Sequence, residues 1–200
     1  IKYLDADDLI YPRGLEVMVH AMEQFPEAGL GISQKVVEDE KPYPFLMQPK
    51  ETFKREFLMR GVLGLGPTGT IIRRDVFKKL GGFTGTRYIG DTELWYKIAL
   101  TYPVVKIEDD LIFWRQHDDQ EITKGQESFF YLENTFKLKF NTLYKKELPL
   151  GAPERQAALK KLTHRFSRNI ARLFLKGHIV LANTIRKSCG ISWMNFFKAL

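Results

Sequence analysis

Two aspartates at alternate positions are the first residues in the chain that could do chemistry. Asp5 and Asp7 follow the short apolar run at positions 1–4 and open an acidic loop. Carboxylates spaced in this way can reach one divalent cation or its water shell. Mg²⁺ and Mn²⁺ are commonly held by one or two carboxylates, with substrate phosphates and water as the other ligands. The pair therefore predicts a metal and phosphate site; the alternative is a solvated acidic turn in which Asp8 caps the next helix.

Two other motifs begin with similar letters and match less well. A calcium-binding loop counted from Asp5 has Glu16 at its twelfth position but needs glycine at its sixth, where this chain has Ile10. A haloacid-dehalogenase-type phosphatase also opens with a strand and two spaced aspartates. Its motif ends in Thr or Val, whereas Leu9 stands at that position here. The calcium loop is not expected, and the phosphatase is kept as the weaker rival.

Another carboxylate begins a predicted helix further along the chain. Asp91 opens this helix, and Glu93 and Trp95 follow it. A helix-start aspartate suits an N-cap, because its side chain can accept a backbone N–H two or three residues on. It also suits a general base that takes a proton from a sugar hydroxyl beside a cleft. In that case Glu93 and Trp95 would add a hydrogen bond and an apolar ring face for the sugar.

A guanidinium and an imidazole follow the apolar strand predicted at 111–114. Arg115 and His117 at the end of a strand suit a metal–diphosphate site, as charge partner and ligand. A lone histidine is more often a surface or packed residue, so both interpretations stay open for His117.

Strands and helices alternate through the first part of the chain. The apolar periods predict strands at 1–4, 29–37, 70–73, 104–107 and 111–114, and helices at 12–25, 51–59, 75–80 and 91–102. From about Thr123 onward, apolar residues recur every three or four positions, which predicts helices alone. We therefore expect a first domain at 1–120 and a basic, amphipathic helical extension at 121–200.

The charge divides between the same two parts. Residues 1–119 hold 16 Lys and Arg against 19 Asp and Glu, a balance of −3, and residues 120–200 hold 15 against 5, a balance of +10. The single cysteine, Cys189, excludes an internal disulfide or a thiolate zinc site and fits a reducing compartment. The longest uncharged window, 61–72, is shorter than the roughly 18 residues of a spanning helix. No signal peptide is visible, and a chain that opens inside a strand predicts a fragment of a longer protein.

Taken in chain order, four segments resemble family 2 glycosyltransferases of the GT-A fold. They are the double-aspartate segment at 3–8, the block at 66–83, the helix start at 90–95 and the closing R-x-H at 114–117. The resemblance covers about residues 1–120. It implies an α/β fold, a partial GT-A mixed sheet with flanking helices, followed by an all-helical C-terminal extension. Two positions depart from the family pattern: Gly90 stands where an acidic residue precedes the base, and Asp118-Asp119 follow the histidine in place of Ser or Asn.

The resemblance implies metal-dependent, inverting transfer of a sugar from a nucleotide-diphospho-sugar donor to an acceptor hydroxyl, with Asp91 as catalytic base. The other implied roles are donor binding by Asp5, Asp7, Gly69 and Arg115, binding of Mn²⁺ or Mg²⁺ by Asp5, Asp7 and His117, and acceptor binding by Glu93 and Trp95. The acceptor would be a sugar or lipid-linked, in the cytoplasmic synthesis of a cell-envelope polysaccharide, lipopolysaccharide or glycoconjugate. The family's nucleotide-binding segment precedes the aspartate pair, so this fragment alone is expected to be inactive.

The basic second part carries no motif of its own. Its helices could pack on the first domain or on another copy in a homo-oligomer. Alternatively, its Lys and Arg, with aromatic residues such as Trp193, could bind an anionic membrane surface at the inner face of the plasma membrane. Nucleic acid is not expected, because no nucleic-acid-binding signature accompanies the charge. The alternative to an enzyme is a non-enzymatic membrane-surface or oligomerisation module.

Overall fold

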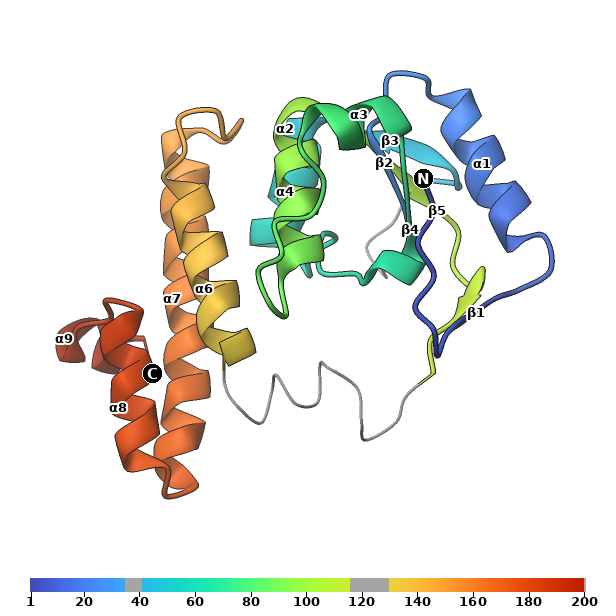
Figure 1. Ribbon diagram of the computed structural model, residues 1–200. Helices are drawn as coiled ribbons and strands as arrows, with labels where there is room; N and C mark the ends of the chain where they lie inside the picture. Colours follow the sequence, from blue (N-terminus) through green and yellow to red (C-terminus); the bar gives the residue numbers. More distant parts are fainter. Residues whose placement is uncertain (35–40, 116–129, 200) are drawn as a thin grey trace. The chain divides into compact units, whose positions relative to one another are not determined.

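The computed structural model describes residues 1–34, 41–115 and 130–199 (Figure 1). The chain divides into two compact units, Ile1–Gln120 and Glu121–Leu200, and each is described by itself. Unit 1 combines a mixed sheet with flanking helices, and the described part of unit 2 consists of helices and turns. The coarse prediction of a mixed α/β fold is confirmed.

The main sheet of unit 1 has four strands in the order β3-β5-β2-β4. Their bounds are Leu30–Ser33 for β2, Phe45–Met47 for β3, Thr70–Ile72 for β4 and Val104–Ile107 for β5. The central pair, β2 and β5, is parallel, whereas β4 and β3 join its two sides antiparallel. All residues of β2 and β5 are buried, as expected for strands that are covered on both faces.

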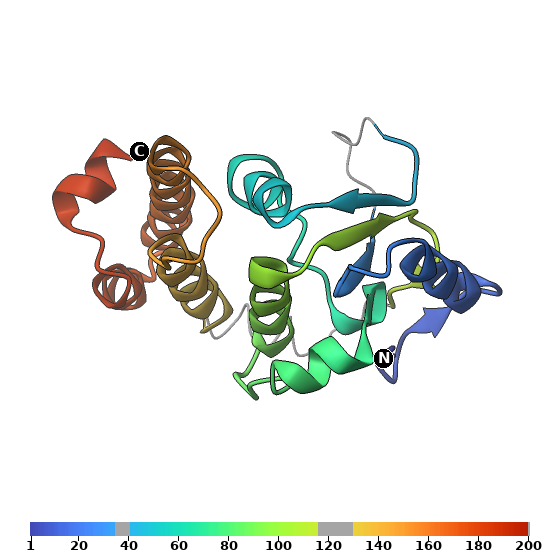
Figure 2. The same ribbon diagram turned by 90° about the horizontal axis from the view of Figure 1, so that it is seen from above.

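Helices cover both faces of this sheet. The helices of unit 1 are α1 (Gly14–Gln24), α2 (Pro49–Leu58), α3 (Arg74–Lys79) and α4 (Gly90–Thr101). Figures 1 and 2 show the strands between α1 on one side and α2 and α4 on the other. In α1, Met18 and Met22 are one turn apart, so they share one face of the helix, and both pack in a buried cluster with Ile107 of β5. Burying this stripe is what holds α1 on the sheet.

The predicted strand at 1–4 is wrong as a regular element. Ile1 meets β4 at one point, where its carbonyl oxygen accepts a hydrogen bond from the backbone N–H of Ile72 at 2.9 Å. Residues 1–5 have no regular secondary structure, because polar contacts of Lys2 and Asp5 draw this segment onto the 3₁₀ turn at Pro67–Gly69 that precedes β4.

A second, two-stranded ribbon joins the region after the acidic loop to the last strand of unit 1. Strand β1 (Leu9–Ile10) pairs antiparallel with β6 (Ile112–Phe113). The ribbon extends by one bond from the N–H of Tyr11 to the carbonyl oxygen of Leu111, at 3.1 Å. It therefore brings the two ends of the motif-bearing region side by side.

The described part of unit 2 contains four helices, α6 (Phe130–Leu143), α7 (Ala152–Leu175), α8 (Ile179–Ser188) and α9 (Trp193–Lys198). Helices α6 and α7 pack through apolar faces, and the rings of Phe136 and Phe166 meet edge to face with centroids 4.7 Å apart. At the start of α7, the guanidinium of Arg155 donates to the carbonyl oxygens of Leu143, Lys145 and Leu148. The side chain of Arg155 therefore holds the turn between α6 and α7 through hydrogen bonds to its carbonyl oxygens.

None of the helices within residues 1–34, 41–115 and 130–199 combines the length and apolar character that crossing a bilayer requires.

Candidate functional site

Asp5 is fixed to the block that precedes β4. Its backbone N–H donates to Thr68 Oγ1 at 3.1 Å, and Thr68 Oγ1 lies 3.2 Å from Asp5 Oδ2, to which it donates its proton. Thr68 is 2% exposed and sits in the 3₁₀ turn, 63 positions away in sequence. The acidic loop itself is closed by a bond from the N–H of Asp8 to the carbonyl oxygen of Asp5, at 3.1 Å. Two of the segments that resemble the glycosyltransferase family are thus tied directly to each other.

Lys2 lies against the same turn. Its Nζ donates to the carbonyl oxygens of Thr68 and, at 2.9 Å, of Tyr3. Burial lowers the pKa of Lys2 to about 8, although the nearby carboxylates of Asp5 and Asp8 act in the opposite direction. The ammonium group therefore fastens the acidic loop to its support and partly offsets the charge of the loop.

The electrostatics of Asp5 favour an additional cation. Burial raises its pKa above the ordinary value, the hydrogen bond from Thr68 lowers it, and the charges of Asp8 and Asp7 raise it further. A carboxylate whose charged form is disfavoured by burial and by like charges gains most from a positive partner. In the described residues, no group of three or more His, Cys, Asp or Glu side chains gathers as a ready-made metal cage. A donor set of two carboxylates still fits Mg²⁺ or Mn²⁺ that takes its other ligands from phosphates and water.

Asp91 stands at the beginning of α4, close enough for Asp5 to affect it. Burial raises its pKa, hydrogen bonds from Thr92 lower it, and the charge of Asp5 raises it further. The N-cap residue of α4 is Ile89, which makes no side-chain cap bond, so Asp91 is not the N-cap. Its Oδ1 instead accepts from the backbone N–H and the hydroxyl of Thr92. The charge of the acidic loop therefore acts on Asp91, which belongs to the helix start at 90–95.

Arg115 reaches the loop through its backbone. Its N–H donates to Asp8 Oδ1 at 3.1 Å, while its side chain belongs to an exposed residue. Asp8 is 5% exposed, and the N-cap of α1 is Arg13, without a side-chain cap bond. The expected capping of the next helix by Asp8 is therefore wrong, whereas the loop remains exposed to solvent at Asp5. His117, the other predicted ligand, lies outside the described residues.

The two acceptor candidates differ in what they expose. Glu93 is partly exposed, and its Oε2 accepts a hydrogen bond from the hydroxyl of Thr84. Trp95 is fully buried, its Nε1–H donates to the carbonyl oxygen of Leu65 at 2.8 Å, and its ring packs against Phe83. The expectation that Trp95 offers a ring face to an acceptor is corrected, because both its face and its polar atom are used inside unit 1.

Gly69 is explained by packing. A Cβ at this position would lie 2.2 Å from Cδ2 of Leu65, so any other residue would require the Leu65 side chain to move. Gly69 is buried under that side chain. Its contribution in the structure is to let the segment held by Trp95 close over the turn that holds Asp5.

No family model matches the chain, and no curated protein matches it either. The assignment of a function therefore rests on the residues and on the geometry described above.

Sequence reasoning missed the residue that supports the glycine-rich segment. Glu56, near the end of α2, is 5% exposed. Its Oε2 accepts from the backbone N–H groups of Val62 and Leu63 at 2.8 and 2.9 Å, and its Oε1 accepts from the hydroxyl of Tyr96 at 2.7 Å. The one sequence signal for this role was an acidic residue on a helix just before a run of glycines.

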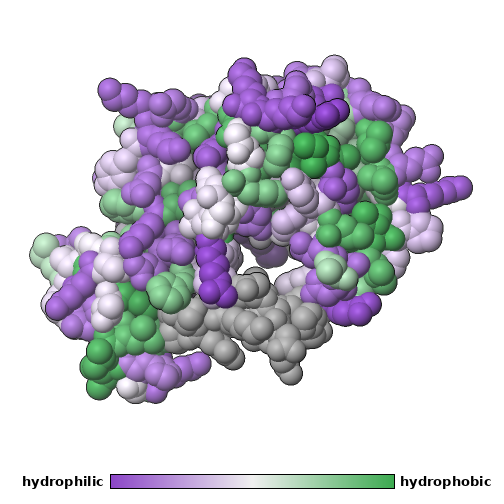
Figure 3. All heavy atoms as spheres, in the orientation of Figure 1, coloured by the Kyte–Doolittle hydropathy of each residue, from purple (hydrophilic) through white to green (hydrophobic). Residues whose placement is uncertain are grey.

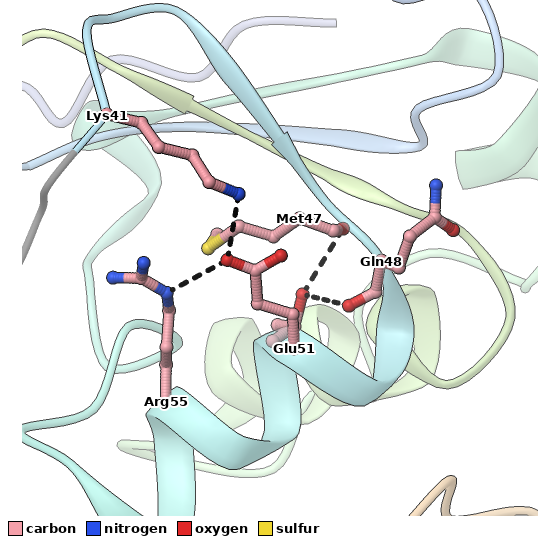
Figure 4. A network of polar contacts seen from close by, with 6 residues as sticks. Lys41, Met47, Gln48, Glu51 and Arg55 are labelled. Atoms are coloured by element: carbon pink, nitrogen blue, oxygen red, sulfur yellow. Dashed lines mark hydrogen bonds and ion pairs between the residues drawn. The ribbon is translucent and has the colours of Figure 1, made fainter.

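The other end of α2 is anchored separately. Glu51 forms ion pairs with Lys41 and Arg55, at 3.5 and 3.4 Å, and the hydroxyl of Thr52 donates to the carbonyl oxygen of Gln48 (Figure 4). The hydroxyl of Thr52 also lies 3.5 Å from the carbonyl oxygen of Met47, which links the first turn of α2 to the end of β3, whereas the ion pairs of Glu51 lie within α2 or reach Lys41 before β3.

Proposed function

We propose that unit 1 is the donor- and acceptor-handling part of a family 2 glycosyltransferase with a GT-A-like fold. The observation that carries this proposal is the hydrogen bonding of Asp5 to Thr68, together with the effect of the Asp5 charge on Asp91. These residues come from three separate segments that resemble the family in order.

Asp5 and Asp7 are the residues that would hold Mn²⁺ or Mg²⁺. Such an ion supplies positive charge that neutralises the diphosphate leaving group. The chain's own part is to keep the two carboxylates in a fixed loop, which Thr68 and Lys2 do through the contacts at Asp5 and at the 3₁₀ turn. The exposed side chain of Arg115 is a suitable further partner for phosphate oxygens.

Asp91 is proposed as the general base. Its Oδ accepts the proton of the acceptor hydroxyl while the hydroxyl oxygen forms a bond to the anomeric carbon. The bond from that carbon to the diphosphate oxygen breaks, and the electron pair leaves with the diphosphate, so the configuration inverts. Burial supports this role because it raises the pKa of Asp91 and makes its carboxylate a stronger base. Partly exposed Glu93, two positions on, is proposed to hydrogen-bond the acceptor.

Two helix-start aspartates allow a matched test of this role. Asp91→Asn should lower sugar transfer by about 100-fold or more, because general base catalysis typically contributes that much. Asp75→Asn changes an exposed aspartate in the first turn of α3 and should leave transfer unchanged. Transfer is to be measured in the complete natural protein with Mn²⁺ and a panel of nucleotide sugars. Equal activity of the two variants would remove Asp91 from the mechanism.

A binding measurement tests the metal-ligand assignment apart from turnover. Asp5→Asn and Asp7→Asn should each reduce the thermal stabilisation that Mn²⁺ and a nucleoside diphosphate produce together. Stabilisation that is independent of Mn²⁺, or unchanged in both variants, would contradict the proposed site.

A further inference from the structure

Large apolar side chains stand exposed at one end of unit 2. Leu175, Ile179 and Val180, at the turn from α7 to α8, are 87%, 63% and 82% exposed, and Trp193, Met194 and Phe197, on α9, are 45%, 64% and 67% exposed. Figure 3 shows hydrophobic side chains gathered at the lower left, where Figure 1 has the end of α7 and the start of α8. These six residues are called the apolar patch.

The two groups of the apolar patch are joined by packed rings. Phe174, next to Leu175, has its ring centroid 5.9 Å from that of Trp193 and 6.0 Å from that of Phe196. Helix α9 therefore packs on the end of α7. The two groups of the patch are therefore linked through the contact of Phe174 with Trp193 and with the buried ring of Phe196.

Hydrogen-bonded turns hold these residues outward. Gly177 has φ 83° and Gly190 has φ 65°, the left-handed conformation that commonly ends helices. After them, the N–H of His178 donates to the carbonyl oxygen of Leu173, and that of Ile191 donates to the carbonyl oxygen of Arg186, both at 3.0 Å. Exposure of the patch is thus a property of two capped turns rather than of a frayed helix end.

Arg186 also fixes the position of α9. Its guanidinium carbon lies 4.1 Å from the ring centroid of Trp193, and its Nη1 donates to the carbonyl oxygen of Ile191 at 2.6 Å. Arg186 is 7% exposed. Arg186 is therefore a buried cation that positions the partly exposed ring of Trp193.

The charge around the apolar patch identifies that partner. Arg172, Lys176, Lys187 and Lys198 are exposed on the same helices, and no acidic residue follows Glu154 in the sequence. A second copy docked on this surface would bring like charges together, whereas an anionic lipid surface complements them. Aromatic and aliphatic side chains next to lysines are the combination that binds at the headgroup boundary.

We propose that the apolar patch and its surrounding lysines bind the surface of an anionic phospholipid bilayer. The patch enters the boundary between headgroups and acyl chains, and the lysines contact the anionic headgroups. This inference does not depend on the proposed sugar transfer, since all its residues lie in unit 2.

Flotation of the 200-residue chain with phosphatidylcholine vesicles, with and without about one-third phosphatidylglycerol, tests the charge contribution. Binding is expected only with the anionic lipid and should weaken strongly in high salt. Lys176→Gln, Lys187→Gln and Lys198→Gln together should weaken it by at least about tenfold. Lys145→Gln, Lys146→Gln and Lys160→Gln together remove the same charge from exposed positions in the turn after α6 and in the first half of α7, and should change binding much less.

A matched aromatic pair tests the apolar contribution. Phe197→Ser should weaken vesicle binding several-fold, whereas Tyr144→Ser should leave it unchanged. Phe197 and Tyr144 are 67% and 62% exposed, and each contacts neighbouring rings: Phe197 contacts Trp193 and Phe196, and Tyr144 contacts Phe140 in a tilted arrangement. Both substitutions therefore remove a mostly exposed ring with aromatic neighbours. Circular dichroism checks that both variants keep their helices.

Three results would overturn the proposal. The first is equal binding to neutral and anionic vesicles. The second is equal loss in each variant and its control. The third is no vesicle binding by a chain that instead forms a dimer, detected by sedimentation and dissociated by Phe197→Ser, because the patch would then be covered by a second copy.

Discussion

The backbone N–H of Arg115 donates a hydrogen bond to Asp8 Oδ1 at 3.1 Å, across 107 positions of sequence. This bond continues the pairing of β1 with β6, and it anchors the end of the acidic loop to the segment that leads to His117. Asp8 is nearly fully buried, so its carboxylate serves the fold while Asp5 and Asp7 remain the candidates for the cation.

Asp8→Ala should destabilise unit 1 by about 1–3 kcal/mol, because it leaves a part-buried N–H without its acceptor. Asp8→Asn should cost less, since an amide oxygen can accept the same bond. Asp109→Ala, at an exposed position, serves as the control and should change stability by less than about 0.5 kcal/mol. Urea denaturation measures all three variants, and an equal effect of Asp8→Ala and Asp109→Ala would contradict the structural role of Asp8.

Glu56 should be the most sensitive acidic residue on α2. Glu56→Ala leaves two buried N–H groups and the hydroxyl of Tyr96 without an acceptor, which should cost about 3 kcal/mol or more. Glu51→Ala removes ion pairs with Lys41 and Arg55, whose side chains are 54% and 11% exposed, and should cost about 1 kcal/mol, less than Glu56→Ala. The free energies of unfolding, measured with urea, should differ accordingly; similar values would mean that the glycine-rich segment does not depend on Glu56.

The coarse architecture of the chain was predictable because it depends on local periodicity. The spacing of Met18, Ala21 and Met22 indicated α1 and its buried face, and the repeat around Phe166 indicated α7. The same period placed Trp95 with Leu94 and Ile98 on one side of α4, but Trp95 was nevertheless expected to contact an acceptor, and the structure shows its ring buried.

Contacts between distant segments were not predictable in this way. The bonds from Thr68 to Asp5 and from Arg115 to Asp8 join residues 63 and 107 positions apart, and no local pattern encodes such a partner. The buried role of Glu56 was hidden for a related reason. An acidic residue on a helix usually marks a solvated face, whereas Glu56 is buried. The N–H groups of Val62 and Leu63 that donate to it lie in a loop that has no apolar period.

The raised pKa of Asp91 predicts a specific pH dependence of stability. Between its ordinary value of 3.8 and its higher folded value, the folded chain retains a proton that the unfolded chain has lost. Stability should therefore fall as pH rises through this window. Asp91→Asn removes the titration and should flatten the slope, and the raised pKa of Asp5 still contributes a slope of the same sign. Urea midpoints from about pH 3 to pH 7 measure this, with Asp75→Asn as control; parallel curves for wild type and Asp91→Asn would contradict it.

Arg186 should control the position of α9 more than the stability of the remaining helices of unit 2. Arg186→Lys keeps the charge but loses the planar stack on Trp193 and the forked donation to Asn183 and Ile191. We expect hydrogen exchange in residues 190–198 to accelerate several-fold while α6 keeps its protection. Arg172→Lys, at an exposed position on α7, should leave exchange in residues 190–198 unchanged.

Because α9 carries half of the apolar patch, Arg186→Lys should also weaken binding to anionic vesicles although no charge is lost. Unchanged exchange in residues 190–198 would mean that the aromatic contacts with Phe174 hold α9 without Arg186.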